Sequence, residues 1–118
     1  MINENLTING EAVSSEEDIL SFFDEDTFEC VIDDYSLNVE FSSDGNAFIV
    51  WCDSYNDEVS YYDNGSGSSE NVDLIINVCP EERMMCYDFD VLKDIVLYFC
   101  ETGMCNPDYD WIEETFGE

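Results

Sequence analysis

The sequence predicts an α+β fold in which an antiparallel meander sheet of about five strands carries an N-terminal and a C-terminal helix packed on one face. Apolar residues follow helical spacing near both ends of the chain and alternate with a period of two between them. Short turns separate the alternating runs, as expected for neighbouring antiparallel strands. The 118 residues, 45% of them hydrophobic, contain no internal repeat and fit a single domain, 1–118, with its own core.

The N-terminal part predicts one short helix after an irregular start. The first residues form a loose arm or a short edge strand around Leu6 and Ile8. Ser14 and Glu17 then have the spacing of a capping box, in which each side chain bonds a backbone amide near the start of a helix. The predicted helix covers about 15 to 24, and its apolar stripe is Ile19, Leu20, Phe22 and Phe23.

The middle of the chain predicts the strands. Asp44-Gly45 is a strong hairpin-turn signal between two of them. The polar, glycine-rich stretch 64–71 is predicted as a loop. The run from Ala47 to Cys52 is apolar on both faces, as in a central strand. The predicted strands are 28–32, 37–41, 47–52, 59–63 and 72–78.

The C-terminal helix has the clearest signals. Asp88 or Asp90 can cap its start, and Gly103 stands where a glycine ends many helices. Pro107 prevents continuation, and we expect a short extended tail over 108–112. The apolar stripe of this helix is Val91, Leu92, Ile95, Val96 and Phe99.

The charge of the chain is its most unusual property. The chain has 30 acidic residues and two basic ones, Arg83 and Lys93, so its formal net charge is −28. A net charge of roughly 2–8 in magnitude is typical of a soluble small domain. Three explanations compete: a basic, nucleic-acid-binding partner for which carboxylates replace phosphates, adaptation to high salt, and a buffer for multivalent cations. Six cysteines and 14% aromatic residues fit the salt explanation poorly. We therefore expect a basic protein partner, bound by a monomer in a 1:1 complex.

Several function classes are disfavoured by the residues that the chain lacks. Without histidine there is no Ser-His-Asp or Cys-His catalysis, and no Walker A or dinucleotide fingerprint occurs. The spacing of Cys100 and Cys105 does not match zinc ribbons, and the loop Asp63–Gly67 lacks the ligand pattern of an EF-hand. We expect no enzyme activity, no cofactor, no metal site and, with two cations, no nucleic-acid binding.

The location predicted from the sequence is cytoplasmic. No run approaches the roughly 18 apolar residues that span a bilayer, and an anionic membrane surface would repel the chain. The N-terminus does not have the composition of a signal peptide. We therefore expect the cysteines to be reduced and mostly in the core, because four of them lie within apolar runs: Cys30, Cys52, Cys79 and Cys100.

One face of the predicted sheet is the candidate binding surface. If Val39, Tyr61 and Leu74 face the helices, carboxylates and a few large apolar residues, Ile75 among them, collect on the opposite face. Aromatic residues framed by charges are typical of an interface core with a polar rim; the alternative is a solvated face with scattered aromatics. The predicted partner-binding residues are Glu29, Asp33, Glu40, Trp51, Asp53, Glu58, Tyr62, Asp73 and Asp110.

The C-terminal segment has a family resemblance. The helix Val91–Gly103, which ends in Phe-Cys-Glu-Thr-Gly, is followed by Pro107 and by Trp111-Ile112-Glu113. This pattern resembles the end of the Imm1 family, which are immunity proteins of bacterial polymorphic toxin systems. The order of an acidic helix, Glu16–Phe23, followed by a strand meander is similar too. The chain is far more acidic than the family pattern requires, and no motif in its strands matches.

The resemblance implies a protein inhibitor whose partner is a cognate toxin domain, a nuclease or a nucleic-acid deaminase with a basic cleft. It carries over no catalytic residue, and Trp111 is expected to close the core. A phage-type DNA mimic that blocks a restriction or CRISPR effector is the alternative. A salt-adapted or cation-binding protein without a macromolecular target is the third possibility.

Overall fold

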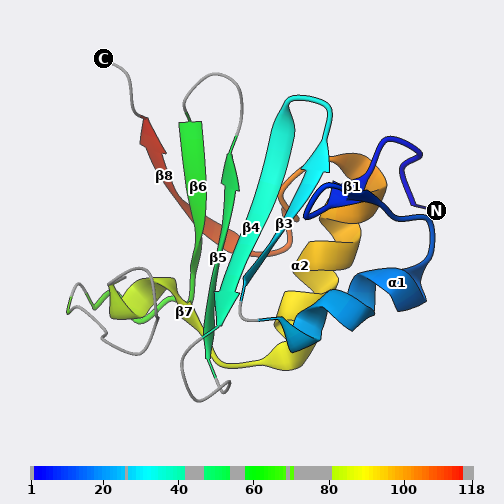
Figure 1. Cartoon of the computed structure of the whole chain (residues 1–118). Coiled ribbons are helices and arrows are strands. Elements are labelled where there is room, and N and C mark those ends of the chain that lie inside the picture. Colours follow the sequence, from blue (N-terminus) through cyan, green and yellow to red (C-terminus); the bar gives the residue numbers. More distant parts are fainter. Residues whose placement is uncertain are drawn as a thin grey trace.

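The computed structural model has an α+β fold with one antiparallel sheet and two α-helices (Figure 1). It describes residues 2–25, 27–41, 47–53, 58–68, 70 and 81–115, and for 58, 114 and 115 it covers the backbone. The helices are α1 (Glu16–Ser21) and α2 (Phe89–Thr102). The strands are β1 (Thr7–Ile8), β2 (Glu11–Ala12), β3 (Thr27–Ile32), β4 (Tyr35–Phe41), β5 (Phe48–Asp53), β6 (Glu58–Asp63), β7 (Met85–Cys86) and β8 (Asp110–Thr115).

The described residues form a larger sheet than the five strands expected. Its eight strands follow the order β2-β1-β3-β4-β5-β6-β8, with β7 paired to β5. The predicted tail is strand β8, which pairs with β6. The short strand expected around Leu6 and Ile8 is β1, but it lies between β2 and β3 and not at the edge of the sheet. Sequence spacing did not reveal β2 and β7, because two-residue strands show no alternation. The predicted strand 72–78 and the turn Asp44-Gly45 lie outside the described residues.

Both helices pack on one face of the sheet, which we call the helix face (Figure 1). Ile19 of α1 and the stripe of α2 share one buried cluster with the inward residues of the central strands. Phe48 in β5 and Phe99 in α2 are among its largest fully buried side chains. Burial of such side chains stabilises the fold by about 1.5–3 kcal/mol each. The period-two and helical stripes therefore meet as predicted.

Helix α1 begins one residue later than expected. Ser15, not Ser14, is the N-cap, and its Oγ accepts a hydrogen bond from the Asp18 amide over 3.1 Å. The α-helix ends at Ser21, and a 3₁₀ turn, Phe22–Asp24, completes the predicted helical span. Both serines suit a cap, so the register of the first turn could not be read from residue type alone.

Helix α2 begins and ends where the sequence predicts. Asp88 caps it by accepting a hydrogen bond from the Asp90 amide over 2.9 Å. Gly103 ends it in the left-handed region, with φ 77°, and its amide donates to the Phe99 carbonyl over 2.7 Å. Among the described residues, neither α2 nor α1 has the length and apolar character needed to cross a membrane.

The end of α2 gives a prediction about stability. Gly103→Ala should lower the free energy of unfolding by roughly 1–2 kcal/mol, because L-residues with a Cβ disfavour the left-handed region. The new Cβ would lie 3.6 Å from Ile32 Cγ2, an ordinary contact, so the cost is conformational and not steric. Urea unfolding measures it. Gly103→Asn is the matched control, since asparagine tolerates this conformation better, and an equal loss in both variants would contradict the explanation.

Candidate protein-binding face

The face of the sheet opposite the helices carries a continuous row of side chains across five strands. In the strand register, Glu29 pairs with Asn38, Asn38 with Trp51, Trp51 with Tyr61 and Tyr61 with Ile112. Directly paired residues in antiparallel strands project on the same side and interact. We call this side of the sheet the open face. The row has a carboxylate at one end, an amide beside it and an apolar group of three at the other end.

The aromatic pair at the centre of the row rests on an apolar base. The ring centroids of Trp51 and Tyr61 are 6.1 Å apart, with 32° between the ring planes. Both side chains are partly exposed and pack, together with Ile112, against a second buried cluster. That cluster consists of Ala47, Ile49, Met84 and Met85. The base restricts the rings, so less conformational entropy is lost when a partner covers them.

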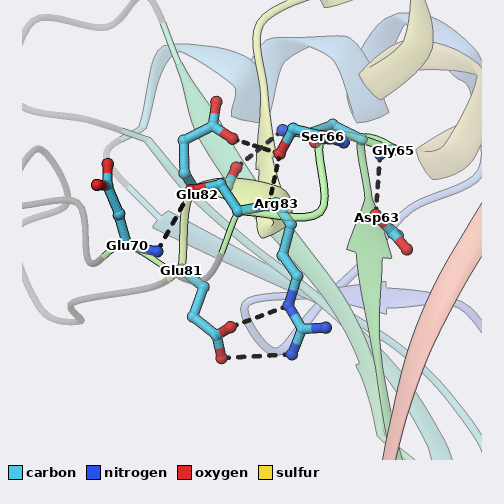
Figure 2. A network of polar contacts seen from close by, with 9 residues as sticks. Asp63, Gly65, Ser66, Glu70, Glu81, Glu82 and Arg83 are labelled. Carbon is cyan, nitrogen blue, oxygen red and sulfur yellow. Dashed lines mark hydrogen bonds and ion pairs between the residues drawn. The ribbon is translucent and has the colours of Figure 1, made fainter.

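A polar network holds the methionines of this base in place (Figure 2). The Asn64 side chain donates to the carbonyls of Glu82 and Met85 over 2.8 and 2.9 Å. Ser66 Oγ donates to Glu82 Oε2 over 2.6 Å, as Figure 2 shows. Arg83 pairs with Glu81, with 2.9 Å between Nε and Oε1. The network therefore fixes the segment 81–86 beside β5 and β6, and it uses one of the two cations of the chain.

A shallow hollow of about 190 Å³ lies beside the aromatic pair. Glu29, Glu40, Asn38 and Trp51 contribute to its wall. Asn9, which also lines it, holds the β3 backbone. Its side-chain Oδ1 accepts a hydrogen bond from the backbone N–H of Glu29, and its backbone N–H donates to the Glu29 carbonyl, both over 3.0 Å. Two carboxylates and the face of an indole in one hollow suit the cationic end of a lysine or arginine side chain.

Asp53 lies in the next row of the open face, opposite Ser36. Burial raises the pKa of its carboxyl above the ordinary value, although hydrogen bonds from Trp51 and Asn38 act in the opposite direction. The Asn38 Nδ2 donor is 3.2 Å from Asp53 Oδ2. A partly desolvated carboxylate of this kind gains when a partner's cation neutralises it.

Other predicted partner-binding residues lie apart from this centre. Asp110 is exposed at the first position of β8, directly opposite Asp63 of β6. Asp33 lies in the turn between β3 and β4 with φ 55°, and its Oδ1 accepts from Asn5 Nδ2 over 3.3 Å. Glu58 pairs with Thr115 through its backbone, while its side chain, like all of Asp73, lies outside the described residues. Ile75, Leu74 and Cys79 also lie outside them.

The two adjacent tyrosines of β6 lie on the faces opposite to those predicted. Tyr61 is on the open face, and Tyr62 is on the helix face, opposite Trp111. The rings of Tyr62 and Trp111 are edge to face, with 6.3 Å between centroids. Both pack against the main core, and burial raises the pKa of Tyr62 to about 12. The prediction failed because Tyr61 shares its side of β6 with Val59, and a buried valine suggested the helix side, whereas Val59 pairs with Asp53 on the open face.

Asn38, Tyr61 and Ile112 are residues of this face that the sequence did not single out. The signal for Tyr61 existed in its alternation with Tyr62, but two neighbouring tyrosines do not indicate which one faces the helices. Asn38 and Ile112 are recognisable only from the register that aligns them with Trp51. In the described part of the chain, no group of three or more acidic or cysteine side chains is arranged to hold a metal ion.

No protein-family model matches the chain, and no curated protein and no solved structure matches it either. The resemblance to the Imm1 family therefore rests on the C-terminal residues that carry it. Trp111, expected to close the core, does pack against it, and its Nε1 donates to the Asn106 carbonyl over 2.9 Å.

The hydrogen bond to Asp53 gives a prediction about its titration. Asn38→Ala removes a donor to the carboxylate, so the pKa of Asp53 should rise further above its ordinary value. Because the folded state already holds this proton more tightly than the unfolded chain, the contribution of Asp53 to stability falls as the pH rises through its folded pKa. NMR titration of the carboxyl carbon measures the change. Thr27→Ala, on the same face but opposite Glu40, is the control, and an unchanged or lowered pKa in Asn38→Ala would contradict the assignment.

Proposed function

We propose that this chain is an acidic protein inhibitor that binds a basic, nucleic-acid-acting protein domain through its open face. The observation that supports this most is the row that contains Trp51, Tyr61 and, beyond Asn38, Glu29, in a chain of net charge −28. Interfaces commonly combine a few aromatic anchors with a charged rim. A partner that binds phosphates presents the opposite charge to this face.

The long-range part of binding comes from uncompensated carboxylates. Of the two cations, Arg83 pairs with Glu81, and Lys93 is exposed on α2, which packs on the helix face. A basic partner approaching the open face therefore meets a negative field with little opposing charge. Such complementarity can raise association rates to about 10⁸–10⁹ M⁻¹s⁻¹ at low salt.

The short-range part of binding comes from the aromatic pair and the hollow beside it. An arginine of the partner can stack on Trp51 while its guanidinium bonds the carboxylates of Glu29 or Glu40, which share the hollow. Burial disfavours the carboxylate of Asp53 and raises its pKa, so a second cation of the partner near this row would stabilise the charged form. Desolvated contacts of this kind slow dissociation.

Within this class we favour an immunity protein over a DNA mimic. The resemblance of Val91–Gly103, Pro107 and Trp111 to the Imm1 family supports it and implies a toxin nuclease or deaminase as partner. The described part of the chain measures 39 × 36 × 25 Å, which favours a docking face over the elongated, duplex-like surface of a DNA mimic. An inhibitor of such an enzyme acts in the cytoplasm, where the nucleic acid lies, and a 1:1 complex suffices to block the cleft.

The aromatic anchor is tested by inhibition. The probe is the proposed partner, the basic nuclease or deaminase domain that we expect the neighbouring gene to encode, assayed with increasing amounts of this protein. The wild type should abolish turnover at a 1:1 ratio, and Trp51→Ala should weaken binding by about 2 kcal/mol, or roughly 30-fold, as for a hot-spot residue. Tyr62→Phe, on the helix face, is the control. Undiminished turnover with excess wild-type protein would overturn the proposed function.

The electrostatic part is tested by a matched pair of charge reversals. Glu29→Lys on the open face and Glu101→Lys at the exposed end of α2 change the net charge equally. Glu29→Lys should lower the association rate several-fold more than Glu101→Lys, and the difference should shrink at high salt. Stopped-flow kinetics at two ionic strengths measures both. Equal effects would mean that the net charge, and not the open face, guides the partner.

A further inference from the structure

The helix face contains two pairs of neighbouring cysteines. Cys30 of β3 and Cys52 of β5 lie in one row, each opposite Leu37 of the strand between them. Cys30 is hydrogen-bonded to the side chain of Cys100 in α2. Cys52 is hydrogen-bonded in the same way to Cys105, which follows the end of α2. All four are free thiols in the structure.

The two pairs differ in their access to solvent. Cys30 and Cys100 are completely buried, with 0% exposure. Cys52 and Cys105 instead line a cavity of about 580 Å³. Met104 and Tyr35 on the wall of this cavity are 63% and 44% exposed, so the cavity reaches the surface. A small solute can therefore reach the second pair but not the first.

We propose that Cys52 and Cys105 form a two-cysteine site that hydroperoxides oxidise to a disulfide. The site goes beyond the proposed inhibitor function: its two thiols belong to the helix face and the segment after α2, and Asp53 of the open face only lines the same cavity. Two observations carry it: both thiols line one accessible cavity, and Cys105 lies in a connecting segment outside α2 and β8. The effect of each thiol on the ionisation of the other agrees with this proximity.

The two cysteines have different roles in the oxidation. The hydrogen bond from Cys52 lowers the pKa of Cys105, whereas the same bond and burial raise the pKa of Cys52. Cys105 is therefore the thiolate that attacks, and Cys52 is the thiol that resolves the product. Acidic neighbours such as Glu113 oppose the ionisation of Cys105, so the reaction needs the contact with Cys52.

The reaction balances with one molecule of hydrogen peroxide, the simplest hydroperoxide, as the oxidant. The Cys105 thiolate attacks one peroxide oxygen, the O–O bond breaks, and hydroxide leaves, which gives a sulfenic acid. The Cys52 sulfur then attacks the Cys105 sulfur, an S–S bond forms, and the S–O bond breaks. The Cys52 proton leaves with the departing hydroxyl as water. The two sulfurs lose two electrons, which the two peroxide oxygens accept.

A disulfide here would connect β5 to the segment between α2 and β8. The closed loop contains β6 and α2, so the unfolded chain would lose much of its freedom. The oxidised protein should therefore unfold at a higher urea concentration than the reduced protein. The same midpoint in both states would contradict the placement of the bond between these two elements.

Peptide mapping tests the site directly. The reduced full-length protein is treated with equimolar hydrogen peroxide, the remaining thiols are blocked, and the denatured chain is digested with trypsin. Cleavage occurs only after Arg83 and Lys93, so Cys52 and Cys105 lie on separate fragments, 1–83 and 94–118. The expected result is a covalent pair of these fragments that a reductant separates. Two unlinked fragments after oxidation would overturn the proposal.

Variants separate this pair from the buried one, since Cys30 and Cys100 are on the same two fragments. Cys105→Ser should abolish the linkage, whereas Cys100→Ala should retain it. In Cys52→Ser the hydroxyl can still donate to Cys105 but cannot form a disulfide, so a sulfenic acid that dimedone labels should remain on Cys105. Circular dichroism verifies that each variant is folded. Linkage that persists in Cys105→Ser, or dimedone labelling spread equally over Cys86 and Cys105, would contradict the assignment.

Discussion

The pairing of β4 with β5 places Asn38 opposite Trp51 on one face of the sheet and Leu37 opposite Cys52 on the other. Because side chains alternate along a strand, a slip of one residue would exchange these two faces. The helix face tolerates no such slip, since Leu37, Val39 and Val50 are fully buried there. Burial under the helices therefore determines the register, and the register in turn builds both the row on the open face and the thiol pair beneath the cavity.

The negative charge of the chain affects the two faces of the sheet differently. Self-repulsion among 30 acidic residues opposes the compact state, and the apolar layer under the helices provides the opposing stabilisation. The open face instead keeps Trp51 and Tyr61 partly exposed over a supporting apolar base. Rings fixed in this way beside carboxylates are suited to a cationic protein surface, which would relieve the repulsion as it covers the rings.

Elements defined by local spacing could be predicted from the sequence. The limits of α2 follow from Asp88 and Gly103, and the central strands follow from their period-two patterns, because both signals depend on a few consecutive residues. The position of α1 was predicted within one residue, since Ser14 and Ser15 are equally suitable caps. The membership of Glu29, Glu40, Trp51 and Asp53 in one face also follows from alternation along β3, β4 and β5.

Features that depend on long-range pairing could not be predicted. Alternation within β6 does not decide whether Tyr61 or Tyr62 faces the helices; the pairing with Trp51 decides it. The segment 81–86 shows no period, yet Met84 and Met85 complete the apolar base of the open face. The contact between Cys52 and Cys105 joins residues far apart in sequence, which no local pattern reports.

The two tryptophans provide the most direct test, because Trp51 lies on the open face and Trp111 on the helix face. Their indole N–H signals can be followed by NMR while the proposed partner, a basic nuclease or deaminase domain, is added. Binding through the open face predicts that the Trp51 signal shifts or broadens and that the Trp111 signal stays in place. A complex that moves Trp111 and leaves Trp51 unchanged would contradict the account.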